Sequence, residues 1–194
     1  ILFDINKIPK LEIDNDIIIH DLVEGHRNQT LAIIHYEKLI SLEPEKIPLE
    51  NLNDILSKKI IVGLKKYGFS GLLPFQEESI RSILKGNNSI ISAPTGSGKT
   101  EAFIIPILQK ILENPIEGVF VLLVYPLNAL IDDQVSKISE LIEKCQLNNI
   151  ISTYSIHGGQ SSQYKDKIIT ESYKKSIILA TNFDFINYHL ILQD

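Results

Sequence analysis

One stretch of eight residues constrains this 194-residue chain more than any other, residues 93–100 with the sequence APTGSGKT. It follows the pattern G-x-x-x-x-G-K-[ST], with alanine in place of the first glycine. Gly96 and Gly98 let the backbone curl so that successive N–H groups point inward at a phosphate, and the helix expected next adds the positive end of its dipole. Lys99 supplies a charge to the β- and γ-phosphates, and the Thr100 hydroxyl is placed to ligate Mg²⁺. We therefore predict a phosphate site here rather than an ordinary glycine-rich turn.

The residues around this stretch alternate between patterns typical of strands and of helices. Strands are predicted at residues 88–92, 119–125, 150–156 and 176–180, and helices at residues 53–67, 74–84, 100–112, 127–144 and 164–173. The aliphatic run from Val119 to Tyr125 is typical of a strand covered on both faces. Strands that alternate with helices imply right-handed crossovers and a parallel sheet. The predicted fold class is α/β, a parallel sheet flanked by helices.

The chain divides near the prolines at positions 44 and 48. Residues 1–48 carry mixed signals, and we interpret them as a small accessory segment whose residues reveal no chemistry. His20, His26 and His35 in this segment lack the cysteine partners and the regular spacing of a metal site. Residues 49–194 are predicted to form the folded domain.

Composition excludes several classes of protein. Hydrophobic residues make up 44% of the chain and charged residues 22%, so the chain can bury a core and is not disordered throughout. The longest apolar stretch, Val119 to Leu127, is less than half of the ~20 residues that a membrane-spanning helix needs, so no membrane partner is expected. The single cysteine, Cys145, fits a reducing, cytoplasmic location. A net charge of −5 argues against a generally basic nucleic-acid coat, although a local groove remains compatible with it.

Four segments resemble, in the family's own order, the motifs of the superfamily 2 helicases and translocases, which are DEAD/DEAH-like. The phosphate stretch and the residues Glu-Ala-Phe after it are similar to motif I. Upstream, residues 67–69 (YGF) and 73–76 (LPFQ) resemble the Q-motif region. Downstream, residues 125–130 (YPLNAL) with Gln134 resemble motif Ia, and residues 180–184 (ATNFD) resemble motif Ib. These last two forms are most similar to the Lhr-type and Ski2-like DNA-helicase branches.

The resemblance implies an amino-terminal RecA-like lobe over about residues 53–192 that binds ATP and Mg²⁺ and moves along a nucleic acid, with DNA favoured. It implies that Gln76 reads the adenine edge, as an amide can, and that Phe69 supports the ring. The residues expected at the nucleotide are Phe69, Gln76, Thr95, Gly96, Ser97, Gly98, Lys99, Thr100 and Glu101, with Lys99 and Thr100 in catalysis and Thr100 also at the metal. The residues expected at the nucleic-acid strand are Pro126, Asn128, Gln134, Gly158, Thr181 and Asn182. Thr181, three residues before Asp184, is also expected to cap the helix that follows.

The D-E-x-[DH] box and the second RecA-like lobe that the resemblance implies lie beyond Asp194. We expect residues 49–194 to be the first part of the lobe, which alone binds nucleotide weakly and turns it over negligibly. The acidic pair Asp132-Asp133 lies within a predicted helix, and we interpret it as a solvated helix face. Two alternatives stay open: another P-loop NTPase, against which Gln76 and the motif Ia match speak, and a non-catalytic RecA-like scaffold or interaction module.

Overall fold

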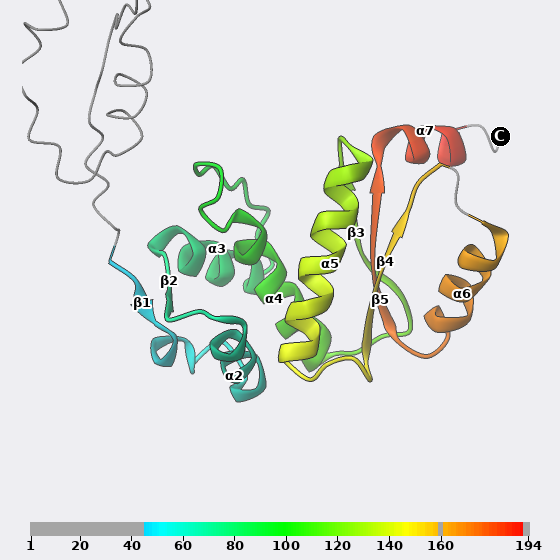
Figure 1. Cartoon of the computed structure of the whole chain (residues 1–194). Helices are drawn as coiled ribbons and strands as arrows, with labels where there is room; N and C mark the ends of the chain where they lie inside the picture. The colour runs from blue at the N-terminus through cyan, green and yellow to red at the C-terminus, as the bar shows by residue number, and fades with distance from the viewer. Residues whose placement is uncertain (1–44, 159–160, 192–194) are drawn as a thin grey trace, which may run out of the picture. The chain divides into compact units, whose positions relative to one another are not determined.

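The computed structural model describes residues 45–158 and 161–191 (Figure 1). Most of the predicted accessory segment, including its three histidines, therefore lies outside the described residues. The elements are β1 (Ile47–Pro48), η2 (Leu49–Leu52), α2 (Lys58–Tyr67), β2 (Gly71–Leu72), α3 (Pro74–Leu84), α4 (Lys99–Glu113), β3 (Gly118–Tyr125), α5 (Asn128–Lys144), β4 (Ile151–Ile156), α6 (Ser162–Ser172), β5 (Ser176–Asn182) and α7 (Phe183–Ile191). Because β1 pairs with β2 in antiparallel fashion, Ile47 and Pro48 belong to the folded domain and not to the accessory segment.

A parallel sheet with the strand order β3-β5-β4 confirms the predicted α/β class. Ala180 of the central strand β5 lies opposite Leu123 of β3 and Ser155 of β4. The chain crosses from β3 to β4 through α5 and returns from β4 to β5 through α6. Since right-handed crossovers in opposite directions place their helices on opposite faces, α5 covers one face of the sheet and α6 the other (Figure 1).

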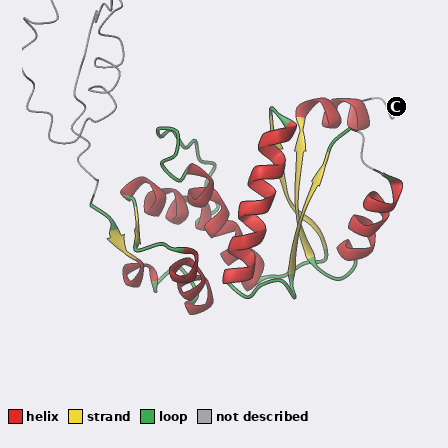
Figure 2. Ribbon diagram, in the orientation of Figure 1, coloured by secondary structure: helices red, strands yellow, loops and turns green. Residues whose placement is uncertain are grey.

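The predicted strand at residues 88–92 is absent from the described structure. The whole stretch between α3 and α4 is a loop (Figure 2), and Ile90 is fully exposed. A strand needs a hydrogen-bonding neighbour, and the described sheet ends at β3 without reaching this segment. The segment instead lines one wall of a cavity of about 320 Å³, whose other wall is α3.

Several aliphatic side chains of β3 are half exposed, which corrects the prediction that the strand is covered on both faces. Val119, Leu122 and Val124 are each about half exposed, at 53%, 48% and 48%, whereas Leu123 is buried. Among the described strands, β3 also lies at the edge of the sheet, because only β5 pairs with it.

The helix α4 anchors the phosphate stretch to the core. Its apolar positions are buried against the neighbouring helices, with Ile104, Ile105 and Leu108 at most 1% exposed. Burial of one such side chain contributes roughly 1.5–3 kcal/mol. α4 therefore holds its first residues, Lys99 and Thr100, in a fixed place at the amino end of a rigid element.

Gly63 of α2 allows the closest approach between α2 and α5. A Cβ at position 63 would collide with the sulfur of Cys145, and would lie 2.6 Å from the Cys145 Cα. The two helices can only pack at this distance because position 63 carries no side chain.

Among the described residues, no helix has both the length and the apolar character needed to cross a bilayer.

The buried thiol of Cys145 gives the first testable prediction. Burial raises the pKa of Cys145 to about 11, so the folded chain keeps the thiol protonated at pH 8. We expect a disulfide reagent to label it at least tenfold more slowly than in the denatured chain, measured by the release of the reagent's chromophore. Because the folded pKa is raised, the stability linked to this proton is present below pH 9 and is lost as the pH rises toward 11. Equal labelling rates would contradict the burial.

Candidate nucleotide and nucleic-acid site

The phosphate stretch forms a tight loop at the amino end of α4. Gly96 and Gly98 both lie in the left-handed region, with φ of 78° and 84°, which favours glycine. Among the described residues, no side chain caps the first turn of α4, because its N-cap position is Gly98. The first N–H groups of the helix are thus left for an acceptor from outside the helix.

Lys99 folds back over the loop. Its Nζ donates to the carbonyl oxygens of Ala93 and Pro94, each at 2.6 Å. The Pro94 carbonyl also accepts from the Ser97 hydroxyl at 2.7 Å and from the Ser97 N–H at 3.3 Å. The ammonium group therefore lies on the loop itself, held by neutral oxygens that a phosphate anion could replace.

The loop fits a nucleotide phosphate by two further observations. A Cβ at Gly96 would meet no atom within 4 Å among the described residues, so the backbone here is open to a ligand. Thr95 and Gly96 form the exposed turn, and Glu101 lies behind it, with its Oε2 near the Gly98 backbone. The exposed turn, the N–H groups at the helix start and Lys99 make up the donor set that phosphates bind.

Gln76 lies against the phosphate loop. It is 3% exposed, its Oε1 accepts from the Leu73 N–H at 2.8 Å, and its Nε2 donates to the Gly98 carbonyl at 2.9 Å. Each end of the amide makes one hydrogen bond within the protein, which leaves one N–H and one oxygen lone pair, and the reading of a base by Gln76 stays a prediction. In the structure Gln76 fastens the start of α3 to the loop.

Phe69 and Tyr67 form a stacked aromatic pair just before β2. Their ring centroids lie 5.9 Å apart with an interplanar angle of 19°. Phe69 is half-buried, which leaves part of its ring available to a planar ligand, and burial raises the pKa of the Tyr67 hydroxyl.

Thr100 bonds to Gln134 of α5, which sequence reasoning did not foresee. The Thr100 hydroxyl donates to Gln134 Oε1 at 2.8 Å, and Gln134 is 8% exposed. Gln134 therefore faces the nucleotide loop, whereas the sequence placed it at the nucleic-acid strand. The described residues contain no cluster of three or more histidine, cysteine or acidic side chains for a metal. One hydroxyl ligand still fits Mg²⁺, which commonly completes its shell with phosphate oxygens and water.

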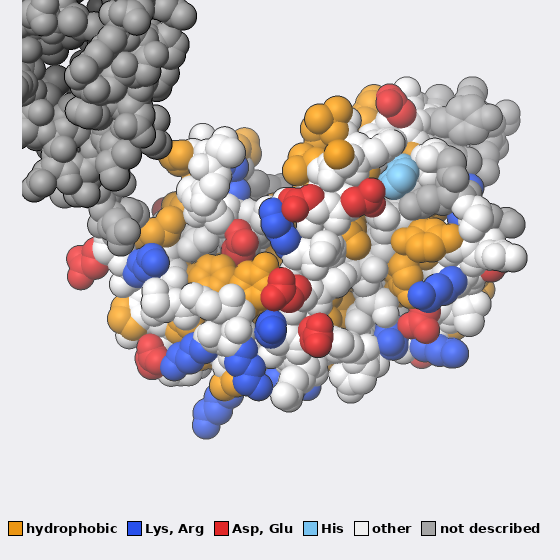
Figure 3. Space-filling model, viewed as in Figure 1, with side chains coloured by type: hydrophobic (Ala, Val, Ile, Leu, Met, Phe, Trp, Pro, Cys, Tyr) orange, Lys and Arg blue, Asp and Glu red, His pale blue; other side chains and the backbone are white. Residues whose placement is uncertain are grey.

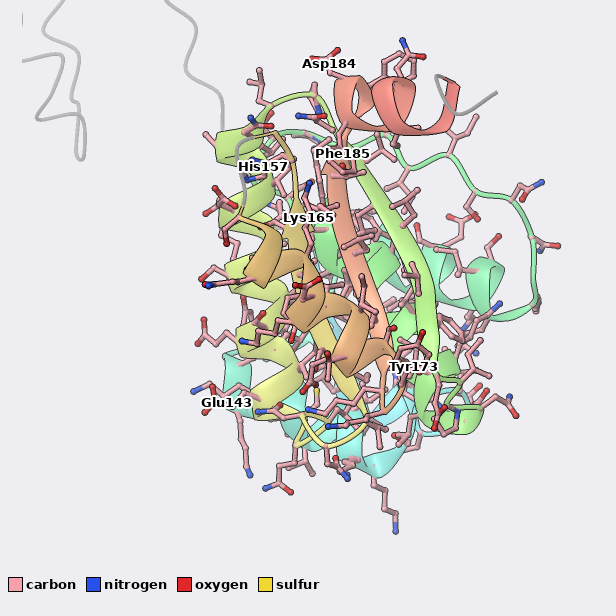
Figure 4. All side chains as sticks on the ribbon, turned by 90° about the vertical axis from the view of Figure 1, so that its right-hand side faces the viewer. Glu143, His157, Lys165, Tyr173, Asp184 and Phe185 are labelled. Carbon is pink, nitrogen blue, oxygen red and sulfur yellow. The ribbon has the colours of Figure 1, made fainter. Side chains whose placement is uncertain are left out.

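The carboxyl ends of β3 and β5 bring two predicted strand-contact residues together. Asn182 Nδ2 donates to Asn128 Oδ1 at 2.6 Å, and Asn182 Oδ1 accepts from the Phe185 N–H at 2.6 Å. Asn182 is thus the residue that caps α7. Figure 4 shows His157, Phe185 and Asp184 at this same end of the sheet, with Tyr173 and Glu143 at the other.

Thr181 does not have the capping role predicted for it. It is 1% exposed, and its hydroxyl donates to the Ile156 carbonyl of β4 at 2.6 Å. Alternation along β5 points the side chains of positions 181 and 182 to opposite faces of the sheet, and of the two only Thr181 is buried. The sequence signal therefore found the helix but placed its cap, and with it the helix start, one residue too early.

The loop after β4 contacts α5 through the side chain of His157. His157 Nε2 lies 3.6 Å from Asp132 Oδ1, and the next residue, Gly158, is exposed, as is Pro126. Asp132 is 63% exposed, and Asp133, at 49%, pairs with Lys137 at 2.7 Å. The hydrogen bond from Lys137 lowers the pKa of Asp133. The acidic pair is a solvated helix face, as interpreted.

On the face shown in Figure 3, both charge signs are interspersed over α5, and basic side chains gather over α2.

Comparison with known proteins places this geometry in one family. Residues 73–194 match the family model for the DEAD/DEAH box helicase. The ATP-dependent RNA helicase ROK1 of Kluyveromyces lactis is 30% identical over 154 residues, which cover 75% of this chain and 26% of that protein.

Two solved structures share the fold. The DUF1998 helicase MrfA bound to DNA and AMPPNP gives a TM-score of 0.70 at 23% identity, over 89% of this chain and 22% of that one. The DEAD-box helicase Mss116 bound to ssRNA and UDP-BeF gives 0.61 at 26% identity, over 71% of this chain and 29% of that one. The chain thus spans about a quarter of the length of these relatives, at 26%, 22% and 29%.

Proposed function

The chain belongs to the DEAD/DEAH box helicase family, and from that premise we propose that it is the ATP-binding part of an ATP-dependent nucleic-acid helicase or translocase. One observation carries the proposal. A loop with two left-handed glycines lies at the amino end of the buried helix α4, which no described side chain caps, and Lys99 folds over that loop. In the intact protein, ATP hydrolysis would be coupled to movement along a strand through a second RecA-like lobe.

The loop would bind the phosphates by exchanging partners. The Ala93 and Pro94 carbonyls that now accept from Lys99 would give way to phosphate oxygens, which bind an ammonium group more strongly because they are charged. The N–H groups of residues 97–100 would complete the cradle. Thr100 would be a ligand of Mg²⁺, which supplies charge neutralisation at the phosphates when bound. Gln76 keeps one N–H and one oxygen lone pair for a base, and Phe69 would support its ring.

The strand would be held at the carboxyl ends of β3, β4 and β5. Pro126, Asn128 and Gly158 are exposed there, and Asn182 is half-buried. Amides, backbone N–H groups and a glycine turn contact sugar and phosphate without reading bases, so we infer a grip that is independent of sequence. Thr181 and Gln134 would support this surface from inside, since both are buried.

The finer proposal is that the strand is DNA. The forms YPLNAL and ATNFD resemble the DNA-helicase branches, and the chain shares its fold with MrfA, which was solved bound to DNA; both support the proposal. ROK1 is an RNA helicase by name, so the test must compare both polymers. In the intact protein, single-stranded DNA is expected to stimulate ATP hydrolysis more than RNA of equal length and sequence, measured as phosphate release. Greater stimulation by RNA would overturn the DNA preference alone.

Replacement of Lys99 tests the nucleotide site directly. Lys99→Ala is expected to weaken binding of a fluorescent ATP analogue about tenfold or more, because a hydrogen bond to a charged group is worth about 1.5–3 kcal/mol. Lys110→Ala, at the other end of α4, is the matched control and should leave the affinity unchanged. If the unaltered chain binds no nucleotide at millimolar concentration, the scaffold alternative replaces the proposal.

A further inference from the structure

The hydrogen bond between Thr100 and Gln134 joins the two parts of the candidate site. Thr100 lies in the first turn of α4, beside the phosphate loop, and Gln134 lies on α5, whose amino end borders the carboxyl ends of the strands. The bond is 2.8 Å long and half-buried, and Gln134 is 8% exposed. A buried amide that bonds across two helices at this point constrains both of them.

The direction of the bond decides what Thr100 can do. A hydroxyl has one proton to donate and two lone pairs. In the structure the proton goes to Gln134 Oε1, so both lone pairs point away from α5 and remain for a cation. A residue that accepts a hydrogen bond from a metal ligand fixes the orientation of that ligand. Loss of such a residue typically lowers metal affinity about 10–100-fold.

The neighbouring carboxylate fixes the amide of Gln134 in its turn. Gln134 Nε2 donates to Asp133 Oδ2 at 3.1 Å, and the same oxygen accepts from Lys137 at 2.7 Å. If the amide were flipped, its oxygen would face this carboxylate and its NH₂ group would face Thr100. Repulsion between the two oxygens disfavours that state, so Asp133 keeps Oε1 turned toward the Thr100 hydroxyl.

We propose that Gln134 is a positioning residue that orients the Thr100 hydroxyl toward a divalent cation and so ties nucleotide loading to the amino end of α5. The inference rests on the proposed nucleotide-binding function. The first turns of α5 also carry Asn128, bonded to Asn182, and Asp132, paired with His157. A change at Thr100 on cation binding therefore acts, through one helix, on contacts to the ends of both β4 and β5.

The experiment compares the affinity of the chain for a fluorescent ATP analogue in Mg²⁺ and in EDTA. Gln134→Met keeps the length of the side chain and removes both polar atoms. Gln134→Glu, made together with Asp133→Asn so that its second oxygen faces an amide, keeps an acceptor for the hydroxyl. The ratio of the two affinities should fall about tenfold or more in Gln134→Met and stay near the wild-type ratio in the double variant. Hydrogen exchange of residues 128–132 should slow on addition of the Mg²⁺ complex in the wild type, and not in Gln134→Met.

Gln109→Met is the matched control, because Gln109 is a second buried glutamine, on α4, that accepts from the Ser57 N–H at 2.8 Å. It should lower the thermal midpoint and leave the Mg²⁺ ratio unchanged. An equal loss of affinity in Mg²⁺ and EDTA for Gln134→Met, or an unchanged ratio, would overturn the positioning role while the nucleotide site stands. Absence of nucleotide binding by the wild type would overturn the proposed function itself, and the inference with it.

Discussion

Gly98→Ala is expected to lower the affinity for an ATP analogue by at least about tenfold. Position 98 has φ of 84° and ψ of 35°, where an L-residue with a Cβ costs roughly 1–2 kcal/mol. The new Cβ would also collide with Nε2 of Gln76, which is itself held by the Leu73 N–H. The alanine variant therefore populates other loop conformations, and binding must first restore the competent one.

Gly96→Ala separates the two causes. Position 96 has a similar φ of 78°, but a Cβ there would meet no described atom within 4 Å. Gly96→Ala should thus show the backbone effect alone and weaken binding less than Gly98→Ala. Shortening Gln76 in the double variant Gly98→Ala/Gln76→Ala should recover part of the loss. The measurement is a fluorescence titration, and equal effects of the two glycine variants would show that the clash with Gln76 is unimportant.

Gly63→Ala is expected to cause the largest loss of stability in the chain. The added methyl group would overlap with the sulfur of Cys145 and lie 2.6 Å from its Cα, so α2 and α5 must move apart. Overpacking typically costs about 1–3 kcal/mol, and the overlap with backbone atoms places this variant at the upper end of that range. The thermal midpoint should then fall by roughly 6–12 °C, measured by circular dichroism.

Val62→Ala is the control, since Val62 is the neighbouring residue on α2 and is 48% exposed. Its midpoint should change little, because surface substitutions usually stay within about 0.5 kcal/mol. Cys145→Ala should rescue Gly63→Ala only in part, because it removes the sulfur but leaves the overlap between the new methyl group and the backbone of residue 145. A Gly63→Ala midpoint equal to that of Val62→Ala would contradict the close packing of the two helices.

Local signals predicted most elements within a few residues. α3 begins at Pro74 and ends at Leu84, as expected from the proline at the first helical position. β4 and β5 also agree, because short β-branched runs between helices have few alternatives in an α/β chain. The strand expected at residues 88–92 is not formed, and the reason is not local. Its composition suits a strand, but a strand also needs a hydrogen-bonding neighbour, and no strand of the described sheet pairs with this segment.

The phosphate loop was equally predictable, because its pattern fixes both conformation and chemistry within one short segment. The partners of Gln76, Gln134 and Thr181 were not. Each forms a hydrogen bond to a residue more than twenty positions away, to Gly98, Thr100 and Ile156 respectively. A motif states which side chains matter, whereas the direction in which an amide or hydroxyl points is decided by packing between elements.

The side of β3 with which no described strand pairs has a practical consequence for every titration described above. It exposes a row of backbone donors and acceptors flanked by half-exposed aliphatic side chains, a template onto which another molecule of the chain can add as an extra strand. Self-association at the edge would grow with protein concentration and consume the species that binds nucleotide. Apparent dissociation constants should therefore drift upward in concentrated samples, and dilution series checked by light scattering will give the intrinsic values.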